Sequence, residues 1–339
     1  MKTWCLGLLL GLWPTLAGSQ APVPGARDIT IKASPVPLNS ESPRTQTLGQ
    51  LAYEGGLSLS SEDEDFGGLS GLIIAPDQSH LIAVTDRGHW VCMVPLHSPE
   101  GRLISIESAW MRRMKGLNGK GMTGKQQTDA EGLTRTPDGT AILASFEGEH
   151  RIWRYATDDP TDLCSVASAV PEPVALPQGV TRLPNNGGLE AITALPDASL
   201  VVLSEHGRAG GGRLGWRLPI EGLTDSPAQR LAYKVPKPFA PTDMTQFGEH
   251  VYVMHRHFSV LSGVSGLISR IPIDAFCDDT NVVSSEELAR FSPPITVDNF
   301  EGISAVAAPL GRTGLYVVSD DNFNPFQQTL LLKFSLTEN

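Results

Sequence analysis

The chain has 339 residues, of which 40% are hydrophobic and 19% charged, so it is long and apolar enough to bury a full core. Its formal net charge is −11, from 26 basic and 37 acidic residues, which argues against the basic surface that a nucleic-acid-binding protein needs to displace phosphate counterions. An anionic small molecule is compatible with this charge when a divalent cation lies between the two.

The N-terminal residues have the pattern of an export signal. A charged start at Met1 to Trp4 precedes a short apolar segment from Cys5 to Leu16, and small residues from Ala17 to Ala21 offer a cleavage site. Neither this segment nor any later one is long enough to span a bilayer. We therefore expect a signal peptide at residues 1–21 and one domain at residues 22–339. The mature protein is expected to be exported to the periplasm or the extracellular space, without a transmembrane anchor, as a monomer.

Five segments of the remaining chain place a hydroxyl or a carboxylate at the start of a short apolar run, about 53 to 61 residues apart. These residues are Ser70, Glu131, Glu190, Asp243 and Glu301. In three copies a Pro-Asp turn leads into a second, β-branched run, which predicts a hairpin. The second runs end in another polar residue, namely Asp86, Glu147, Glu205, His255 and Asp320. The period predicts a repeated unit with two polar points.

Three or four strands per repeat, without helical periodicity between them, predict an all-β fold. A β-propeller accounts for the repeat because radial repetition leaves few free sheet edges, whereas a pair of β-sandwiches needs no period. The last motif begins too near the C-terminus to supply a whole unit. Strands expected near residues 28–33 and 48–59 would complete it, pairing the N- and C-terminal strands in one of five blades. If those strands form a sheet of their own, there are six blades.

Three cysteines remain after removal of the signal peptide: Cys92, Cys164 and Cys277. At most one internal disulfide can form among them. Our expectation is that Cys164 pairs with Cys277, and that Cys92, which lies in a strand-like run, is a buried thiol. None of the three has the spacing of a metal ligand.

The innermost strands of a propeller line its channel, so four of the five marked residues should bring carboxylates to one axis. Carboxylates this close repel one another unless a cation neutralises them, and calcium accepts many oxygen ligands in loose geometry. Asp129, Asn299 and Asp320 can add ligands. The sequence leaves open the alternative that each carboxylate binds backbone amides and ties neighbouring blades together.

Basic residues accompany the second polar points. Arginine binds phosphate or carboxylate oxygens through two parallel hydrogen bonds, and histidine moves protons near neutral pH. The candidates for substrate contact or proton transfer are Arg87, His206, Arg208 and His255. Each acid and base can instead be a local salt bridge of little energetic weight. No serine nucleophile motif is present, because the segment Gly263 to Gly266 lacks the required spacing, so a metal-assisted hydrolase is favoured over a covalent one.

Several of these segments together resemble the phytase-like domain of proteins described as "esterase-like activity of phytase family". They are Phe66 to Leu72, Val84 to Gly88, Asp129 to Gly132, Gly188 to Ala191, Asn299 to Ile303 and Ser319 to Asn322. The similarity extends from about Gly49 to the C-terminus. It implies a secreted bacterial β-propeller related to phytases and phosphoesterases, with calcium as a candidate cofactor.

These observations combine into a functional expectation. We expect a hydrolase of esters, above all phosphoesters, that takes a small anionic substrate. The expected calcium ligands are Asp129, Glu131, Glu190, Glu301 and Asp320, whereas Asp243 departs from the Glu-Gly form and Ser70 lacks the acid. A lactone hydrolase is a close variant. The alternative from another class is a non-catalytic propeller that binds a ligand or a cell-envelope protein.

Overall fold

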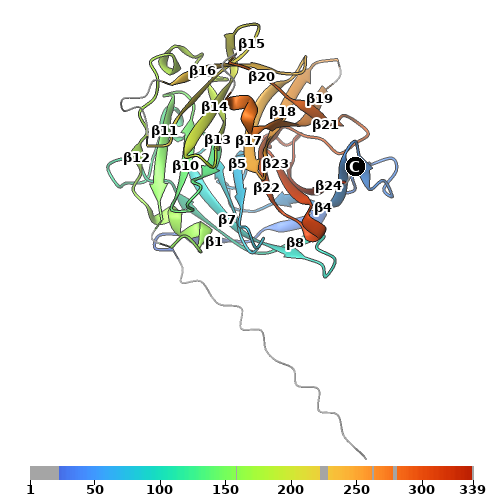
Figure 1. Cartoon of the computed structure of the whole chain (residues 1–339). Coiled ribbons are helices and arrows are strands. Elements are labelled where there is room, and N and C mark those ends of the chain that lie inside the picture. The colour runs from blue at the N-terminus through green and yellow to red at the C-terminus, as the bar shows by residue number, and fades with distance from the viewer. Residues whose placement is uncertain (1–22, 158, 222–227, 262, 278–280, 338–339) are drawn as a thin grey trace, which may run out of the picture.

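The computed structural model describes residues 23–157, 159–221, 228–261, 263–277 and 281–337, so the signal peptide expected at residues 1–21 lies outside the described part. The described residues form five sheets arranged around a central axis as a β-propeller (Figure 1). The all-β fold with five blades is therefore confirmed, and the six-blade alternative is wrong.

Each blade begins with an innermost strand, and the next strands pair outward in chain order. Blade one contains β5 (Leu69–Ile74), β6 (Leu81–Thr85), β7 (His89–His97), β8 (Leu103–Arg113) and β1 (Arg27–Ile29). Blade two contains β9 (Ala130–Arg135), β10 (Ala141–Phe146), β11 (Arg151–Ala156) and β12 (Glu172–Pro173). Blade three contains β13 (Leu189–Ala194), β14 (Ser199–Ala209), β15 (Gly212–Pro219), β16 (Gln229–Lys234) and β20 (Val282–Ser284).

The other two blades follow the same plan. Blade four contains β17 (Ala240–Phe247), β18 (His250–Ser259), β19 (Gly263–Pro272) and β21 (Glu286–Phe291). Blade five contains β22 (Phe300–Ala307), β23 (Thr313–Ser319), β24 (Thr329–Leu336), β4 (Leu51–Ser60), β2 (Lys32–Pro35) and the short β3 (Thr47–Leu48). The helical segments are short: α1 (Lys125–Thr128) and the 3₁₀ helices η1 (Leu163–Ser168), η2 (Val180–Arg182), η3 (Ile273–Phe276) and η4 (Pro309–Gly311).

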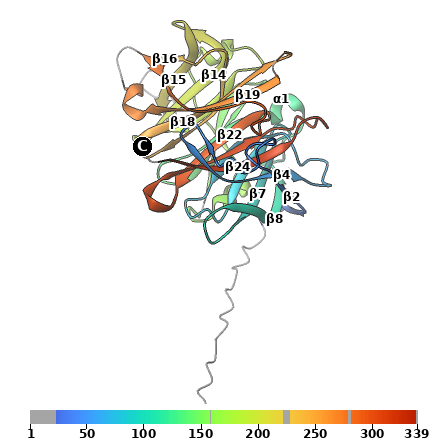
Figure 2. The same ribbon diagram turned by 90° about the vertical axis from the view of Figure 1, so that its right-hand side faces the viewer.

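The propeller is closed by strands from both ends of the chain. The N-terminal β4 pairs antiparallel with the C-terminal β24, as predicted, and Figures 1 and 2 show the blue and red strands side by side. The segment expected at 28–33 is divided, because β1 joins blade one and β2 joins blade five. A buried lysine also links the last blade to the first: Lys333 Nζ donates to Gln78 Oε1 at 2.8 Å and to the Gly101 carbonyl at 2.6 Å.

Apolar side chains fill the five spaces between neighbouring blades. Each hydrophobic cluster draws its members from two adjacent sheets, and none occupies the central axis. The strands β5, β6, β10 and β13 are buried over their whole length, which explains why they appear in the sequence as continuous apolar runs without polar alternation. The end of the channel at which the innermost strands begin is lined mainly by polar residues.

The glycine that follows the marked acid allows the innermost strands to lie close together. A Cβ atom on Gly132 would lie 2.4 Å from the Glu190 carbonyl oxygen of the next blade, and one on Gly302 would lie 2.3 Å from that of Ser70. Neither distance can be accommodated by a side chain. The Glu-Gly pairs are thus a requirement of the narrow channel, independently of any chemistry.

The disulfide bond corrects the expected pairing. Cys92 on β7 is bonded to Cys164 in η1, and their Cα atoms are 6.1 Å apart, whereas Cys277 is a free, exposed thiol. The bond fastens the segment between the last two strands of blade two, β11 and β12, onto blade one. The expected pair of Cys164 with Cys277 is therefore wrong.

Loss of this disulfide should weaken the fold measurably. The bond closes a loop of 72 residues, and the chain-entropy relation gives about 4 kcal/mol for a loop of that length, within the usual range of about 2 to 5 kcal/mol. We expect the double variant Cys92→Ala with Cys164→Ala to lose about that much free energy of unfolding in urea titrations. A Cys277→Ala variant serves as the control, and equal stability of the two variants would contradict the expectation.

Candidate functional site

A polar cavity of about 220 Å³ lies where the innermost strands begin, and residues from all five blades line it. We call it the acidic cavity because eight of its thirteen residues are carboxylates: Asp86, Asp129, Glu131, Glu147, Glu190, Glu205, Glu301 and Asp320. Arg256 and Lys125 are its cations. All five residues expected to hold a metal are thus brought together here.

Three of these carboxylates are close enough to share one cation. Asp129, Glu131 and Glu147 each present an oxygen, and the three atoms lie within 4.8 Å of one another. We refer to them as the acidic triad. Calcium binds oxygen at roughly 2.3 to 2.6 Å, so an ion between the three can reach them all. The donors are oxygens alone, which suits calcium and does not favour a soft transition metal.

Hydrogen bonds hold the triad in place. Ser70 Oγ donates to Glu131 Oε2 at 2.9 Å, from the blade that precedes Glu131. Glu147 Oε1 accepts a hydrogen bond from the backbone N–H of Gly188, in the blade that follows. The serine that lacks the acid of its repeat therefore orients the acid of the next repeat. A side chain from the preceding blade and a backbone amide from the following blade thus position the triad.

Arg256 neutralises the other side of the acidic cavity. Its Nη1 lies 2.9 Å from Glu301 Oε1, and its Nη2 lies 3.0 Å from Glu205 Oε1. The Glu301 oxygen also accepts from Asn299 Nδ2 at 2.8 Å. Burial lowers the pKa of Arg256, but the attraction of Glu301 and Glu205 raises it by more than burial lowers it. The net shift is upward, so the guanidinium stays charged. Glu301 is therefore paired by the protein, whereas no arginine is paired with the triad in the described residues.

Several carboxyl groups of the acidic cavity resist ionisation. Burial, reinforced by Glu147 and Asp129, raises the pKa of Glu131 well above its ordinary value, and burial with Glu131 does the same for Glu190. Burial raises the pKa of Asp86 to about 6 and that of Asp320 to about 8. A divalent cation bound among these carboxyl groups would stabilise their charged forms and lower their pKa values.

The raised pKa values predict how stability depends on pH. Burial raises the pKa of Glu301 to about 7, with Arg256 opposing it, and that of Asp320 to about 8. An unfolded carboxyl group has a pKa near 4, so above that pH the unfolded chain holds fewer protons than the folded one, and stability falls as pH rises. Buried His89, His97 and His255, whose pKa values are lowered to about 4, act in the opposite sense but only below about 6.5.

We therefore expect the melting temperature in a chelator to fall between pH 6.5 and about 8. An Asp320→Asn variant, which holds no proton to release, should show a shallower fall over the same range. Scanning calorimetry at four pH values tests both statements. A melting temperature that rises over this interval would contradict the assigned ionisation states.

Asp243, the fourth acid of the repeat, has a structural role instead. It is fully buried and its Oδ2 accepts from the backbone N–H of Ile303 at 2.9 Å, which ties blade four to blade five. Hydroxyl groups make equivalent ties elsewhere, from Thr134 to Ala194 and from Ser304 to Ile74. The alternative that a marked acid ties blades together thus holds for this residue.

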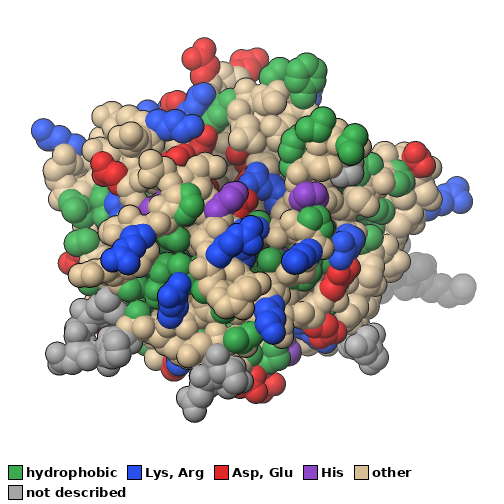
Figure 3. Space-filling view, turned by 90° about the horizontal axis from the view of Figure 1, so that it is seen from above, with side chains coloured by type: hydrophobic (Ala, Val, Ile, Leu, Met, Phe, Trp, Pro, Cys, Tyr) green, Lys and Arg blue, Asp and Glu red, His purple; other side chains and the backbone are tan. Residues whose placement is uncertain are grey.

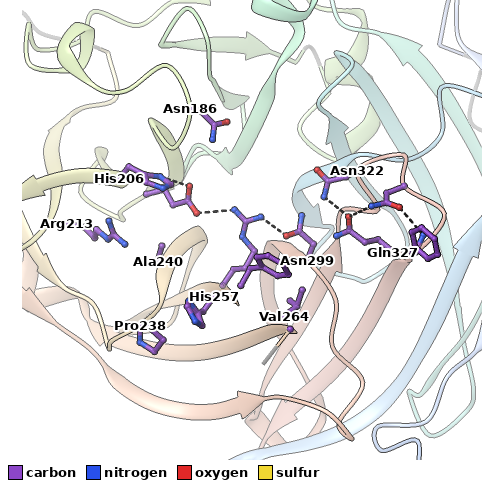
Figure 4. Close-up of a pocket in the computed structure, with 16 residues that line it drawn as sticks. Asn186, His206, Arg213, Pro238, Ala240, His257, Val264, Asn299, Asn322 and Gln327 are labelled. Atoms are coloured by element: carbon purple, nitrogen blue, oxygen red, sulfur yellow. Dashed lines mark hydrogen bonds and ion pairs between the residues drawn. The ribbon is translucent and has the colours of Figure 1, made fainter. Parts of the chain in front are cut away.

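A wider cavity of about 780 Å³ shares Asn186, Glu205, Arg256 and Asn322 with the acidic cavity. We call it the wide pocket, and Figure 4 shows His206 and Arg213 on one side of it and Asn322 and Gln327 on the other. A space-filling view of one face shows acidic, basic and histidine side chains close together near its centre (Figure 3). The two cavities form one continuous site.

The residues expected to contact substrate do not all line the same cavity. His206 lies in the wide pocket, where its Nδ1 is 2.8 Å from Glu205 Oε2. Arg87 lines a third cavity, of about 410 Å³, which shares Asp86 and Lys125 with the acidic cavity, and its guanidinium lies 3.3 Å from the ring centroid of Phe323. Arg208 is exposed on β14 and is not among the residues that line these three cavities.

His255, like Arg208, is an expected residue that does not line these cavities. It is fully buried between blades, with Nε2 2.7 Å from the Tyr233 hydroxyl and Nδ1 3.0 Å from the Leu267 carbonyl oxygen. Burial lowers its pKa to about 4. Both ring nitrogens are engaged, so its position does not support the expected contact with substrate.

Other residues of the site were not chosen as candidates from the sequence. Glu147 follows Glu131 by the same 16 residues that separate Asp86 from Ser70, so the repeat itself contained the signal. Arg256 was visible only as a neighbour of His255. Arg213 lies on β15, which the repeat does not mark, and Asn186 lies in the loop before β13, outside the marked segment.

Comparison with known proteins gives the following. A family model described as "Phytase-like: Esterase-like activity of phytase" matches residues 64–323. A search of curated proteins gives no match. Among solved structures, an alpha-L-arabinofuranosidase from Lactobacillus brevis is similar at 12% identity with a TM-score of 0.49, covering 79% of this chain and 90% of that one. The WD40 repeats of RRP9 are similar at 9% identity with a TM-score of 0.39, covering 80% and 82%.

Proposed function

The chain belongs to the phytase-like family, and from this premise we propose that it is a calcium-assisted hydrolase of phosphoesters or other anionic esters. The observation that carries the proposal is the position of the acidic triad, which lies in a cavity continuous with a wide pocket containing His206 and Arg213. A cation site and groups that bind anions are thus adjacent. A bound cation would offset the repulsion between an anionic substrate and a protein with a net charge of −11.

The residues of the site divide the work between them. Asp129, Glu131 and Glu147 would hold calcium, which supplies positive charge that polarises an ester and its attacking water. Arg213 binds the anionic group from the wall of the wide pocket. The Glu205 carboxylate orients His206 through Nδ1, which leaves Nε2 to move a proton. Arg256 is occupied by Glu205 and Glu301 and positions these acids.

The disulfide supports an extension of the proposal to the compartment in which the protein acts. The disulfide between Cys92 and Cys164 is a bond that forms and persists in oxidising surroundings. Among the described residues, none of the helices has both the length and the apolar character needed to cross a membrane. We include in the proposal that the protein acts as a monomer after export to the periplasm or the extracellular space.

Hydrolysis of 4-nitrophenyl phosphate and 4-nitrophenyl butyrate by the purified mature protein tests this function. We expect activity with calcium that a chelator removes, and a fall in kcat/KM on the order of 10² to 10³-fold in Asp129→Asn with Glu131→Gln. Glu107→Gln, at an exposed position on β8, is the matched control and should retain wild-type activity. Absence of hydrolysis in every ester tested would overturn the enzyme and favour a propeller that only binds its ligand.

The pH–rate profile of a His206 variant tests the proposed role of this residue in proton transfer. His206→Gln should lower kcat by roughly 10²-fold and remove one limb of the pH–rate profile, while calcium affinity stays unchanged. An unchanged pH profile would show that His206 does not transfer the proton.

A further inference from the structure

Charged and apolar side chains both line the wide pocket. Its basic residues include His206, Arg213 and Arg256, of which Arg256 also lines the acidic cavity, while Phe258, Val264 and Phe326 are its large apolar residues. Both phenylalanines are open to solvent, with exposed fractions of 65% and 93%. Exposed apolar side chains that gather at one site can mark a ligand-binding surface.

Two separate loops present these rings. The hairpin of β18 and β19 continues beyond the start of β17, because Ala240 pairs with Arg256 while the hairpin extends to the pair Ser259 and Gly263. Phe258 and Val264 are opposite each other in this extension. The β23–β24 loop presents Phe326, whose backbone N–H donates to Asn324 Oδ1 at 3.1 Å.

The β23–β24 loop also holds an unfavourable backbone conformation. Asn322 and Phe323 both have a φ of 49°, in the left-handed region that a phenylalanine rarely adopts. Asn322 lines the acidic cavity, the wide pocket and the third cavity together. Strain of this kind persists where surrounding structure fixes it, and it concentrates at ligand-binding sites.

Four of the five amide side chains that line the pocket are engaged with one another, with the backbone or with charged groups. Asn299 donates to Glu301 and accepts from Arg256, and Asn322 Nδ2 donates to Gln327 Oε1 at 3.3 Å (Figure 4). Asn324 Oδ1 is taken by the backbone of Phe326. A polyhydroxylated substrate would need such groups to be free, whereas an apolar substituent needs the open rings.

We propose that the wide pocket selects esters whose anionic group carries an apolar substituent of the size of an aromatic ring system, and that Phe258 and Phe326 hold this substituent. The inference rests on the proposed function for the position of the anionic group. The volume of the wide pocket, about 780 Å³, is in the range of about 300 to 1,000 Å³ that small-molecule sites occupy. The anionic end lies toward Arg213 and the acidic cavity, and the apolar end lies toward the two loops.

Binding of sulfonates that cannot be hydrolysed tests the pocket independently of catalysis. Calorimetric titration of the calcium-loaded protein with 2-naphthalenesulfonate and methanesulfonate compares the same anionic group with and without rings. We expect the naphthalene compound to bind at least tenfold more tightly, which corresponds to about 1.4 kcal/mol. Equal affinities would overturn the proposal.

Variants of the exposed rings locate the preference. In the double variant Phe258→Ser with Phe326→Ser the ratio of affinities should fall below about threefold. Both residues are exposed, so the fold should not depend on them. The control is Leu310→Ser, which is 84% exposed in η4, beyond the far end of β22, and should keep the full preference. Retention of the preference in the double variant would overturn the assignment of these residues.

The two proposals fail in different ways. A ring preference without hydrolysis of any ester would contradict the hydrolase and support the pocket. Hydrolysis of phosphoesters without a ring preference would support the hydrolase and overturn the pocket.

Discussion

Replacement of Arg256 by methionine is expected to lower the free energy of unfolding by about 3 to 5 kcal/mol at pH 7, because a buried ion pair that loses one partner leaves an uncompensated charge. Arg256 links Glu205 and Glu301, whose side chains are only 8% and 11% exposed. Both would then lie in a cavity that already contains six other carboxylates. Urea titration in the presence of a chelator measures the loss.

The expected loss depends on pH in a definite direction. At pH 5 Glu301, whose pKa is raised to about 7 by burial even with Arg256 present, can accept a proton and so remove part of the uncompensated charge. The difference between wild type and variant should therefore shrink as the pH is lowered from 7 to 5.

An exposed ion pair supplies the matched control. Arg270 contacts Glu286 at 2.8 Å, but the glutamate is 53% exposed, so Arg270→Met should lower the free energy of unfolding by less than about 1 kcal/mol. Arg256→Lys should lie between the two, because an ammonium group cannot link both carboxylates through the planar geometry of a guanidinium. An effect of Arg256→Met no larger than that of Arg270→Met would contradict the electrostatic account.

The second large effect concerns the acidic triad. In a chelator, Asp129→Asn with Glu131→Gln should raise the melting temperature above that of the wild type, because burial and neighbouring carboxylates raise the pKa values of both residues and oppose their charged forms. Neutral amides keep the shape of the side chains without that repulsion. A substitution that removes binding groups and yet stabilises the protein distinguishes a functional cluster from a structural one.

Calcium should reverse the order of the two proteins. A ligand present at 100 times its Kd stabilises the folded state by about 2.7 kcal/mol, which for a chain of this size corresponds to roughly 5 °C. The wild type should gain this increase and the double variant should not. A variant that is less stable than the wild type in the chelator would contradict the repulsion, and an equal calcium response would place the ion elsewhere.

The sequence contains enough information for the plan of the fold, and the reason is the repeat. In four copies the marked residue is the second residue of the innermost strand, so Ser70, Glu131, Glu190 and Glu301 arrive at the same end of one channel. Equivalent residues of a repeat occupy equivalent places in the fold. The period therefore predicts that residues far apart in the chain lie close together, even when no contact between them is known. This is why all five expected metal ligands are found in one cavity.

Where the repeat is irregular, the sequence did not predict the positions of the side chains correctly. His255 follows Asp243 by 12 residues, whereas the other second polar points follow by 15 to 19. The shorter offset places His255 within β18, which continues to Ser259, so the side chain packs between blades, while its neighbour Arg256 reaches the acidic cavity. The alternation of a strand decides which neighbour faces the channel.

The disulfide had no counterpart in the repeat. Cys164 lies in η1, between the last strands of blade two, where the chain leaves the regular pattern and folds back onto blade one. The expected partner, Cys277, follows η3, between β19 and β21 of blade four, and is exposed. Pairing of cysteines depends on distances in space that their spacing along the chain does not supply.

The central claim is that the acidic triad binds calcium, and titration of the chelator-stripped mature protein with calcium in a calorimeter tests it most directly. We predict that the wild type and Glu107→Gln bind with the same affinity, and that Asp129→Asn with Glu131→Gln loses at least about tenfold, or 1.4 kcal/mol. Absence of binding by the wild type, or undiminished binding by the double variant, would contradict the account.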